Sequence, residues 1–310
     1  MRVDRSVAPL GSKLSQFGAR TTEAREPGRD DLDLRSTAEL VALMNAADSA
    51  VPGVVAAAAP AVAAAIDAVV ARLEAGGRLV YLGAGTSGRL AELDAAECQT
   101  TFSTPPGRVV ALVAGDDLDS VIEQQAAEDD GPAGRDAVAL AGISVRDAVV
   151  AISASGRTPW VVEALDGARA AGAVTVCIVS APESELASLA DHEILLPVGA
   201  ELLAGSTRLK AGTAQKLVLN MISTISMIRL GKTFGDLMVD VAATNEKLHA
   251  RVHRIVRQAT AASSDAVDAA LAAADGDAKV AIVSLLTGLD AATARERVTT
   301  SGGNVRRALG

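Results

Sequence analysis

Two short loops combine glycines with hydroxyl side chains, and each loop follows an apolar run and precedes a helical pattern. The first loop covers 83–88 (GAGTSG) and the second covers 152–159 (ISASGRTP). Backbone N–H groups at a helix N-terminus bind anions, and serine and threonine hydroxyls add further donors. Both loops are therefore candidates for holding one phosphate group.

Three interpretations fit the G-x-G-x-x-G spacing of the first loop when it is taken alone. They are a dinucleotide-binding fingerprint, a tight structural turn and a cradle for a sugar phosphate. A dinucleotide site would want an acidic residue near 103–105, where Ser, Thr and Pro stand, and Asp116 comes late. A purely structural turn would not explain the paired serines of the second loop. The second loop therefore favours the sugar-phosphate cradle.

A third polar segment, 199–216, combines a turn, a helix start and the basic side chains Arg208 and Lys210, and it continues to Lys216. One interpretation is an ordinary helix start that Ser206 or Thr207 caps. The other places these groups near the same ligand as the two loops.

Two histidines, His249 and His253, have the i,i+4 spacing of zinc ligands on a predicted helix. No third ligand accompanies them, so an exposed helix face is the favoured interpretation. We predict no metal site.

The elements that would position the loops alternate between short apolar runs and helical patterns. Apolar runs separated by helices predict a parallel sheet covered on both faces, the doubly wound α/β class. Ligands of such sheets bind at the carboxyl ends of the strands, where both loops stand. The predicted strands are 78–82, 108–113, 147–152, 173–180 and 192–197, with helices at 88–98, 118–141, 158–171 and 184–190.

Helical patterns also precede and follow this alternating region. Ser36 and Glu39 have capping-box spacing before a predicted helix at 37–48, and an Ala-rich helix follows at 53–75. The patterns further along predict a long helix at 209–229, a spacer helix at 244–261, and a three-helix module at 264–274, 277–287 and 290–300. We therefore divide the chain into a polar N-terminal segment (1–35), an α/β domain (36–245) and a C-terminal helical module (246–310).

Composition limits the classes of function that the chain can have. The 310 residues carry a formal net charge of −9, which argues against non-specific binding to nucleic acids or anionic membranes. Two cysteines cannot build a disulfide framework, and no run of about 18 uninterrupted apolar residues predicts a membrane span. The N-terminus lacks the apolar run of a signal peptide, so the cytoplasm is the expected compartment.

Longer stretches around these motifs resemble the N-acetylmuramic acid 6-phosphate etherases, a family of the sugar isomerase (SIS) domain superfamily. The resemblance extends from about residue 21 to residue 309, and 199–216 also resembles a signature of glucokinase regulatory proteins. The matching stretches are STAELVALMNAAD (36–48), YLGAGTSGRLAELDAAEC (81–98), AAEDD (126–130), ISASGRTPWV (152–161), 199–232 and 237–248. The α/β domain is thereby identified as an SIS-type catalytic domain.

The resemblance implies a lyase that converts N-acetylmuramic acid 6-phosphate to N-acetylglucosamine 6-phosphate and D-lactate. In the family scheme, a base removes the C2 proton of the open-chain sugar, lactate leaves C3, and water adds to the double bond. Matching positions make Glu97 the general acid, and we assign C2 deprotonation to Glu128. A homodimer that needs no metal and no cofactor is expected. The residues expected to bind the phosphorylated sugar are Gly85, Thr86, Ser87, Ser153, Ser155, Gly156, Thr158, Ser206 and Lys210.

Two other functions stay open on the same scaffold: an aldose–ketose isomerase and a non-catalytic sensor of sugar phosphates. The presence of both glutamates favours the etherase, because isomerisation needs no acid at a C3 leaving group. The chain departs from the family pattern at Gln99 and Thr100 (usually Pro-Pro), at Asp116 (usually Gly) and at Glu26 (usually Asn). The first three of these residues adjoin the expected site and could alter its rim.

Overall fold

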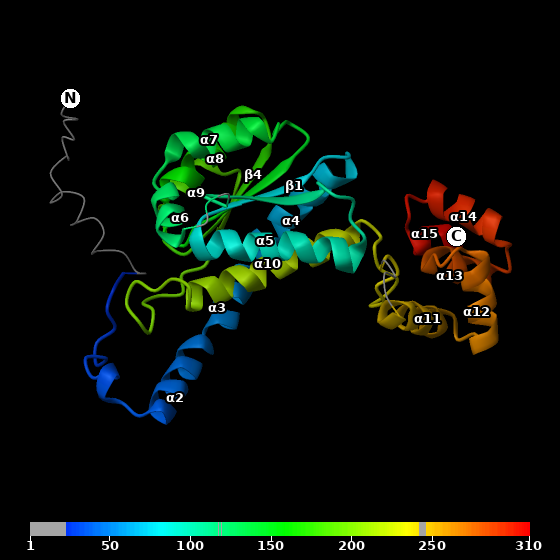
Figure 1. Ribbon diagram of the computed structural model, residues 1–310, viewed down its shortest axis with the longest axis horizontal. Helices are drawn as coiled ribbons and strands as arrows, with labels where there is room; N and C mark the ends of the chain where they lie inside the picture. The colour runs from blue at the N-terminus through cyan, green and yellow to red at the C-terminus, as the bar shows by residue number, and fades with distance from the viewer. Residues whose placement is uncertain (1–22, 117, 119, 242–245) are drawn as a thin grey trace.

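The computed structural model describes residues 23–116, 118, 120–241 and 246–310 of the chain (Figure 1). The first 22 residues of the predicted N-terminal segment lie outside the described residues. The same is true of residues 242–245, where the boundary of the C-terminal module was predicted.

Five parallel strands form one sheet in the order β2-β1-β3-β4-β5, which confirms the predicted doubly wound α/β fold (Figure 1). The strands are β1 (Leu79–Gly83), β2 (Val109–Val113), β3 (Ala148–Ile152), β4 (Val174–Val179) and β5 (His192–Leu195). Gly83, the last residue of β1, pairs with Val113 of β2 and Ile152 of β3. The connections that follow these three strands therefore begin at the same level, on one edge of the sheet.

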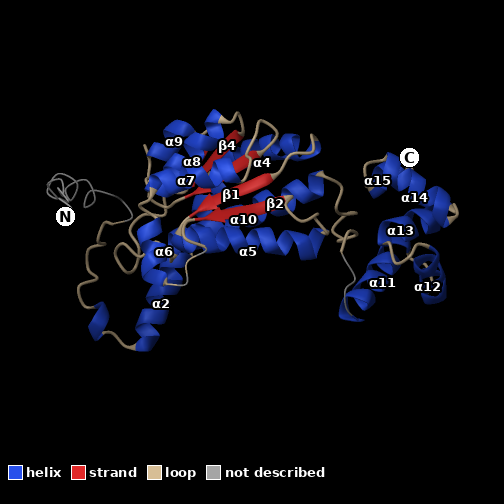
Figure 2. Cartoon of the chain, turned by 45° about the horizontal axis from the view of Figure 1, so that its top comes forward, coloured by secondary structure: helices blue, strands red, loops and turns tan. Residues whose placement is uncertain are grey.

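Helices cover both faces of the sheet (Figure 2), because successive side chains of a strand point to opposite faces. Leu79 and Tyr81 of β1 belong to one buried apolar cluster, whereas Val80 and Leu82 belong to the other. The first face packs against α4 (Ala59–Glu74), α5 (Gly85–Phe102) and α10 (Lys210–Arg229), and the second against α7 (Gly131–Leu140), α8 (Pro159–Ala170) and α9 (Glu185–Leu189).

Helix α5 is longer than the predicted helix at 88–98. It begins at Gly85, directly after the N-cap residue Ala84, and it ends at Phe102. Thr86 and Ser87 consequently lie in its first turn, where backbone N–H groups lack partners within the helix. The glycine loop is thus also the beginning of α5, so it presents hydroxyl and N–H donors together.

Two predicted helices are each divided in two. The pattern at 53–75 forms α3 (Val51–Ala57) and α4, and the pattern at 118–141 forms α6 (Val121–Ala127) and α7. Pro60 and Pro132 stand at the start of the second helix in each pair. Proline lacks the N–H that a helix interior needs, but it is tolerated in the first turn.

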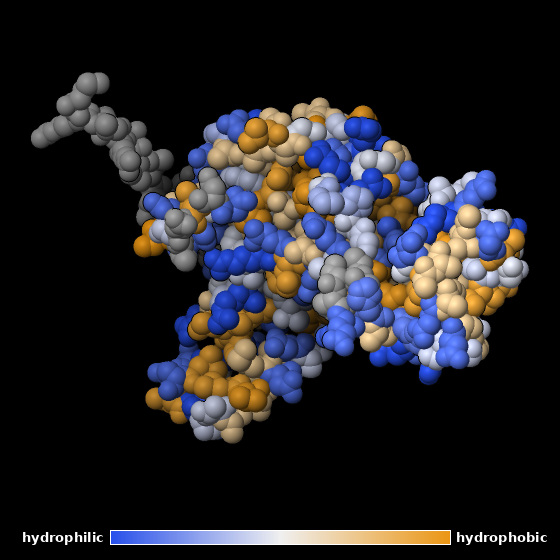
Figure 3. All heavy atoms as spheres, turned by 45° about the vertical axis from the view of Figure 1, so that its right-hand side comes forward, coloured by the Kyte–Doolittle hydropathy of each residue, from blue (hydrophilic) through white to orange (hydrophobic). Residues whose placement is uncertain are grey.

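Helix α2 (Thr37–Asp48) projects from the sheet domain (Figure 1), and the 3-10 turn η1 (Leu32–Leu34) precedes it. The predicted capping box of Ser36 and Glu39 is confirmed at its start. No residue of α2 is buried, and Val41 is 62% exposed. Figure 3 shows hydrophobic side chains on the lobe that contains this helix.

The segment Thr37–Ala57, which contains α2 and α3, has the length and hydropathy of a membrane span, unlike any other described helix. No membrane span was predicted from the sequence, so this segment was not foreseen. Its only buried residues are Val51 and Val55, and it includes the turn between the two helices. Its apolar surface is therefore free to contact another molecule.

The C-terminal helices pack around a hydrophobic core of their own. They are α11 (Glu246–Thr260), α12 (Ser264–Ala273), α13 (Ala278–Thr287), α14 (Ala291–Thr300) and α15 (Val305–Leu309). The prediction of a spacer followed by three helices was incomplete, because α11 buries Val252, Ile255 and Val256 in this core and α15 was not foreseen.

Candidate active site

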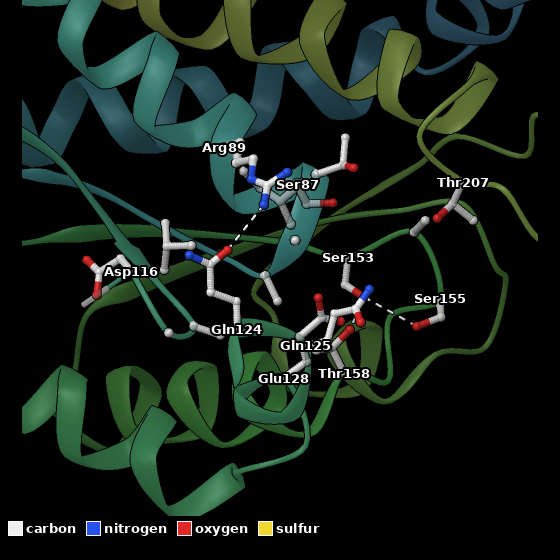
Figure 4. Close-up of a pocket in the computed structure, with 18 of the residues that line it drawn as sticks. Ser87, Arg89, Asp116, Gln124, Gln125, Glu128, Ser153, Ser155, Thr158 and Thr207 are labelled. Carbon is white, nitrogen blue, oxygen red and sulfur yellow. Dashed lines mark hydrogen bonds between the residues drawn. The ribbon is translucent and has the colours of Figure 1, made fainter. Parts of the chain in front are cut away.

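A cavity of about 510 Å³ opens at the carboxyl ends of β1, β2 and β3. Figure 4 shows that the side chains around it come from the start of α5, from α6 and from the loop after β3. Both hydroxyl loops predicted from the sequence contribute to its wall. The described residues that line it include Glu23, Gly85, Thr86, Ser87, Arg89, Glu92, Asp116, Gln124, Gln125, Glu128, Ser153, Ser155, Thr158 and Thr207.

The start of α5 approaches β1 closely because glycines occupy both sides of the contact. A Cβ atom on Gly88 would lie 2.5 Å from Cγ1 of Val113 and 3.2 Å from the carbonyl carbon of Gly83. Ser87, one residue earlier, donates its hydroxyl hydrogen to Oε1 of Gln215 at 2.9 Å. Gln215 belongs to α10, so two helices fix this side chain at the rim of the pocket.

The loop after β3 gathers its hydroxyl groups around Ser153. The Oγ of Ser153 lies 2.9 Å from Oγ1 of Thr158 and 3.4 Å from Oγ of Ser155. It also accepts the backbone N–H of Gly156 at 3.1 Å. Gly156 has a φ of 64°, a left-handed conformation that glycine adopts without strain. This turn holds three hydroxyls at one wall of the pocket, where each can donate to an anion.

Glu128 places its carboxyl group against the start of α5. It is the C-cap residue of α6, and a Cβ atom on Gly85 would lie 2.7 Å from its Oε1. Burial raises the pKa of this carboxyl, the nearby charge of Asp129 raises it further, and Arg89 opposes both. A carboxylate with a raised pKa is a stronger base near neutral pH than an exposed one.

Glu97 lies well away from this pocket. It stands twelve residues after Gly85 on α5, about 18 Å along the helix axis at a rise of about 1.5 Å per residue. Its side chain is 58% exposed and lines a second cavity, of about 450 Å³, with residues of α5 and α10. A single chain therefore does not bring Glu97 and Glu128 together.

A charged network lies beside Glu97. The ammonium nitrogen of Lys216 is 3.5 Å from Oε2 of Glu97 and 3.6 Å from Oδ1 of Asp94. Asp94 is buried, and it accepts hydrogen bonds from the hydroxyls of Tyr81 (2.8 Å) and Ser223 (3.1 Å). Burial raises the pKa of the Asp94 carboxyl. Neither Tyr81 nor Asp94 was singled out from the sequence, although Asp94 stands one helical turn before Glu97.

Of the segment 199–216, Thr207 reaches the pocket, whereas Ser206 and Lys210 are not among the described residues that line it. The ammonium group of Lys210 donates to the backbone oxygen of Val198 at 2.7 Å. The buried carboxylate of Glu201 accepts the backbone N–H groups of Lys210 and Ala211, both at 3.0 Å. This part of the segment fixes the start of α10.

Several pocket residues were not foreseen from the sequence. Arg89 directly follows the glycine loop, and Gln124 stands four residues before Glu128, on the same side of the helix. The positions of Arg89 beside the glycine loop and of Gln124 one turn before Glu128 were signals visible in the sequence. Glu23 carried no such signal, because its place depends on contact with the distant Gly205.

The two histidines with the spacing of zinc ligands, His249 and His253, lie on α11. In the described part of the chain, no group of three His, Cys, Asp or Glu side chains could hold a metal ion. Nε2 of His253 lies 3.3 Å from both Oγ of Ser264 and Oδ1 of Asp268.

Known proteins are similar to this chain over nearly its whole length. A family model of the SIS domain matches residues 132–225, and the model of the glucokinase regulatory protein N-terminal SIS domain matches residues 28–169. The N-acetylmuramic acid 6-phosphate etherase of Streptomyces avermitilis is 53% identical, with 98% of each chain covered. That of Rubrobacter xylanophilus is 52% identical over 95% of this chain and 97% of its own.

Among solved structures, a phosphoheptose isomerase from Francisella tularensis is similar to this chain with a TM-score of 0.49. The two proteins share 19% sequence identity, and the match covers 61% of this chain and 98% of the isomerase.

Proposed function

This chain belongs to the N-acetylmuramic acid 6-phosphate etherase family, as its motifs predicted, and on that premise we propose that it cleaves the D-lactyl ether of N-acetylmuramic acid 6-phosphate. The products would be N-acetylglucosamine 6-phosphate and D-lactate. The observation that carries the proposal is the position of the Glu128 carboxyl beside a pocket walled by two donor-rich loops.

In this proposal, the two loops hold the phosphate. Ser153, Ser155 and Thr158 supply hydroxyl donors from the loop after β3, and Thr86 supplies one from the first turn of α5. Ser87 joins them when its hydroxyl hydrogen turns from Gln215 to the phosphate. Gly85 lies in the glycine loop that begins α5 and lines the pocket, whereas the backbone N–H of Gly156 acts within the loop after β3 by donating to Ser153. Ser206 and Lys210 act indirectly, because they fix the start of α10. Helix α10 in turn carries Gln215, which orients Ser87.

Glu128 is proposed to act as the base at C2 of the open-chain sugar. Its carboxylate takes the C2 proton, the C–H electrons form a C2=C3 double bond, and the C3–oxygen bond breaks. The departing lactate oxygen receives a proton from Glu97. Water then adds its oxygen to C3, while a proton returns to C2. The raised pKa of Glu128 supports this role, because it brings the base closer to neutral pH.

Glu97 is proposed to come from a second copy of the chain. Paired carboxyl groups that act on one sugar ring lie about 5–10 Å apart in glycoside hydrolases. That is less than the roughly 18 Å between Gly85 and Glu97 along α5. The surface near Glu97 supports an interface, because partly exposed apolar side chains of α5 and α10 share it: Leu93, Met221, Ile225 and Ile228. The uncovered helix α2 offers a further apolar surface.

The proposed compartment is the cytoplasm. Both cysteines, Cys98 and Cys177, are buried and free, and burial raises the pKa of each thiol to about 12. Such thiols stay protonated and unreactive at neutral pH. The chain therefore gains nothing from an oxidising compartment.

The experiment that tests the proposed function is incubation of the protein with N-acetylmuramic acid 6-phosphate, followed by assay of D-lactate. Stoichiometric release of D-lactate and N-acetylglucosamine 6-phosphate is the expected result. A ketose product would instead indicate an isomerase, and binding without turnover would indicate a sensor. Either result would contradict the proposal.

A further inference from the structure

Arg89 is the one positively charged side chain among the described residues that line the pocket. It stands in the second turn of α5, directly after the glycine loop. Its Nη2 donates to Oε1 of Gln124 at 3.2 Å, and Nε2 of Gln124 donates to the backbone oxygen of Leu118 at 2.7 Å. Gln124 therefore fixes the direction of the guanidinium group, which is otherwise exposed at the pocket.

The hydroxyl groups of the second loop lie apart from Arg89. Figure 4 shows Arg89 and Gln124 on one side of the pocket, and Ser153, Ser155 and Thr158 on the other. Glu128 lies near Thr158, and the charge of Arg89 offsets part of the rise in its pKa that burial and Asp129 cause. A ligand whose phosphate occupies the hydroxyl wall would therefore extend past Glu128 toward Arg89.

The proposed substrate carries a second anion in addition to its phosphate. The lactyl group on C3 ends in a carboxylate, and C3 is bonded to C2, the carbon that faces the base. The lactyl carboxylate is consequently only a few bonds away from the carbon that faces Glu128. A guanidinium group offers two parallel N–H donors to a carboxylate, an arrangement that adds both strength and directional preference.

We propose that Arg89 binds the carboxylate of the lactyl group and so selects sugar phosphates that carry this substituent. Gln124 acts as a positioning residue, because it orients the guanidinium group without touching the ligand. The inference rests on the proposed function for the identity of the substrate. It adds a contact that distinguishes the substrate from the product, which has the phosphate and lacks the carboxylate.

The test compares the two ligands by calorimetry in the inactive Glu128→Gln background, so that binding is measured without turnover. Adding Arg89→Gln should weaken N-acetylmuramic acid 6-phosphate about 10- to 100-fold, the usual loss for one charge-assisted contact. Binding of N-acetylglucosamine 6-phosphate should change by less than about twofold, because that ligand makes no contact with Arg89. Arg89→Lys should give an intermediate loss, since it keeps the charge but not the paired donors.

Ser155→Ala in the same background is the matched control, and it should weaken both ligands in parallel. A parallel loss with Arg89→Gln would overturn the inference, because Arg89 would then serve the phosphate or the fold. Unchanged binding of both ligands would overturn it as well. Neither result depends on catalysis, whereas failure of the unmodified protein to release D-lactate contradicts only the proposed function.

Discussion

Glu128 shows how neighbouring residues set the chemistry of a single carboxyl group. Burial is the largest cause of its raised pKa, Asp129 adds to the shift, and Arg89 reduces it. As the proposed base, Glu128 works only when it is deprotonated. Activity should therefore fall as the pH drops through a pKa that lies above the ordinary value of 4.5.

The expected test is the acid limb of kcat/KM for D-lactate release. Asp129→Asn removes a negative neighbour, so it should move this limb to lower pH. Arg89→Gln removes a positive neighbour, so it should move the limb to higher pH. The phosphate of the substrate also titrates near pH 6, but its pKa is common to all variants. If the limb stays in place in both variants, Glu128 is not the base.

The candidate site was only partly predictable from individual residues. The hydroxyls of both loops were identifiable, because their place between a strand and a helix is visible in the local pattern. Lys210 reads as a possible ligand contact, yet its ammonium group binds the backbone of Val198. That outcome depends on the path of the turn before α10, which Glu201 fixes through a buried contact. No local pattern encodes such a contact.

At the scale of elements, the parallel sheet followed from the alternation of apolar runs and helices, whereas the order of its strands was learned only from the structure. Helix limits were less predictable, because packing decides them. Helix α5 can begin at Gly85 because Gly88 lies close to β1. That close approach is possible because neither Gly88 nor Gly83 has a side chain. Pro132, in the first turn of α7, accounts for the break between α6 and α7. The periodic pattern obscured this local signal.

The contact of α5 with the sheet can be tested through Gly88→Ala. The added Cβ atom would meet Val113 and Gly83, so α5 should shift away from β1. Overpacking of this kind typically costs about 1–3 kcal/mol of stability. We expect that loss in chemical denaturation, together with weaker binding of N-acetylglucosamine 6-phosphate, because Thr86 and Ser87 move with the helix.

Gly53→Ala is the matched control for this substitution. Gly53 lies in α3, and a Cβ atom there would have no neighbour within 4 Å. Alanine favours a helix over glycine by about 0.5–1 kcal/mol, so this variant should be as stable as the unmodified protein or slightly more so. Equal stability of the two variants would show that the contact at Gly88 is not close.

At the scale of the whole molecule, both charged and apolar contacts connect the C-terminal module to the segment after α10, where Val239 packs into the core of the module. Asp240 follows α10 in the chain and lies 2.6 Å from the ammonium group of Lys232 and 2.8 Å from that of Lys279 in α13. Arg306 of α15 also stacks over the ring of Phe234. The contacts of Lys279 and Arg306 join residues far apart in the sequence, so the periodic patterns that revealed most of the module's helices could not predict how it is attached.

The net charge of the whole chain affects the binding of the proposed anionic ligand. A chain with a net charge of −9 would repel a sugar phosphate at long range. Under the proposed function, hydroxyls, helix N-termini and one arginine at the pocket offset this repulsion locally, so that no basic surface is needed.

The separation of Glu97 from Glu128 predicts that two copies of the chain share each site. Coexpression of Glu97→Gln with Glu128→Gln gives mixed pairs in which one site holds both glutamates and the other holds neither. Random assortment should then restore about a quarter of the native rate of D-lactate release, as closed two-fold symmetry requires. Each variant expressed alone is the control, and each should be inactive. If the mixture is inactive as well, while chromatography shows mixed pairs, then each chain supplies both of its catalytic carboxyl groups itself.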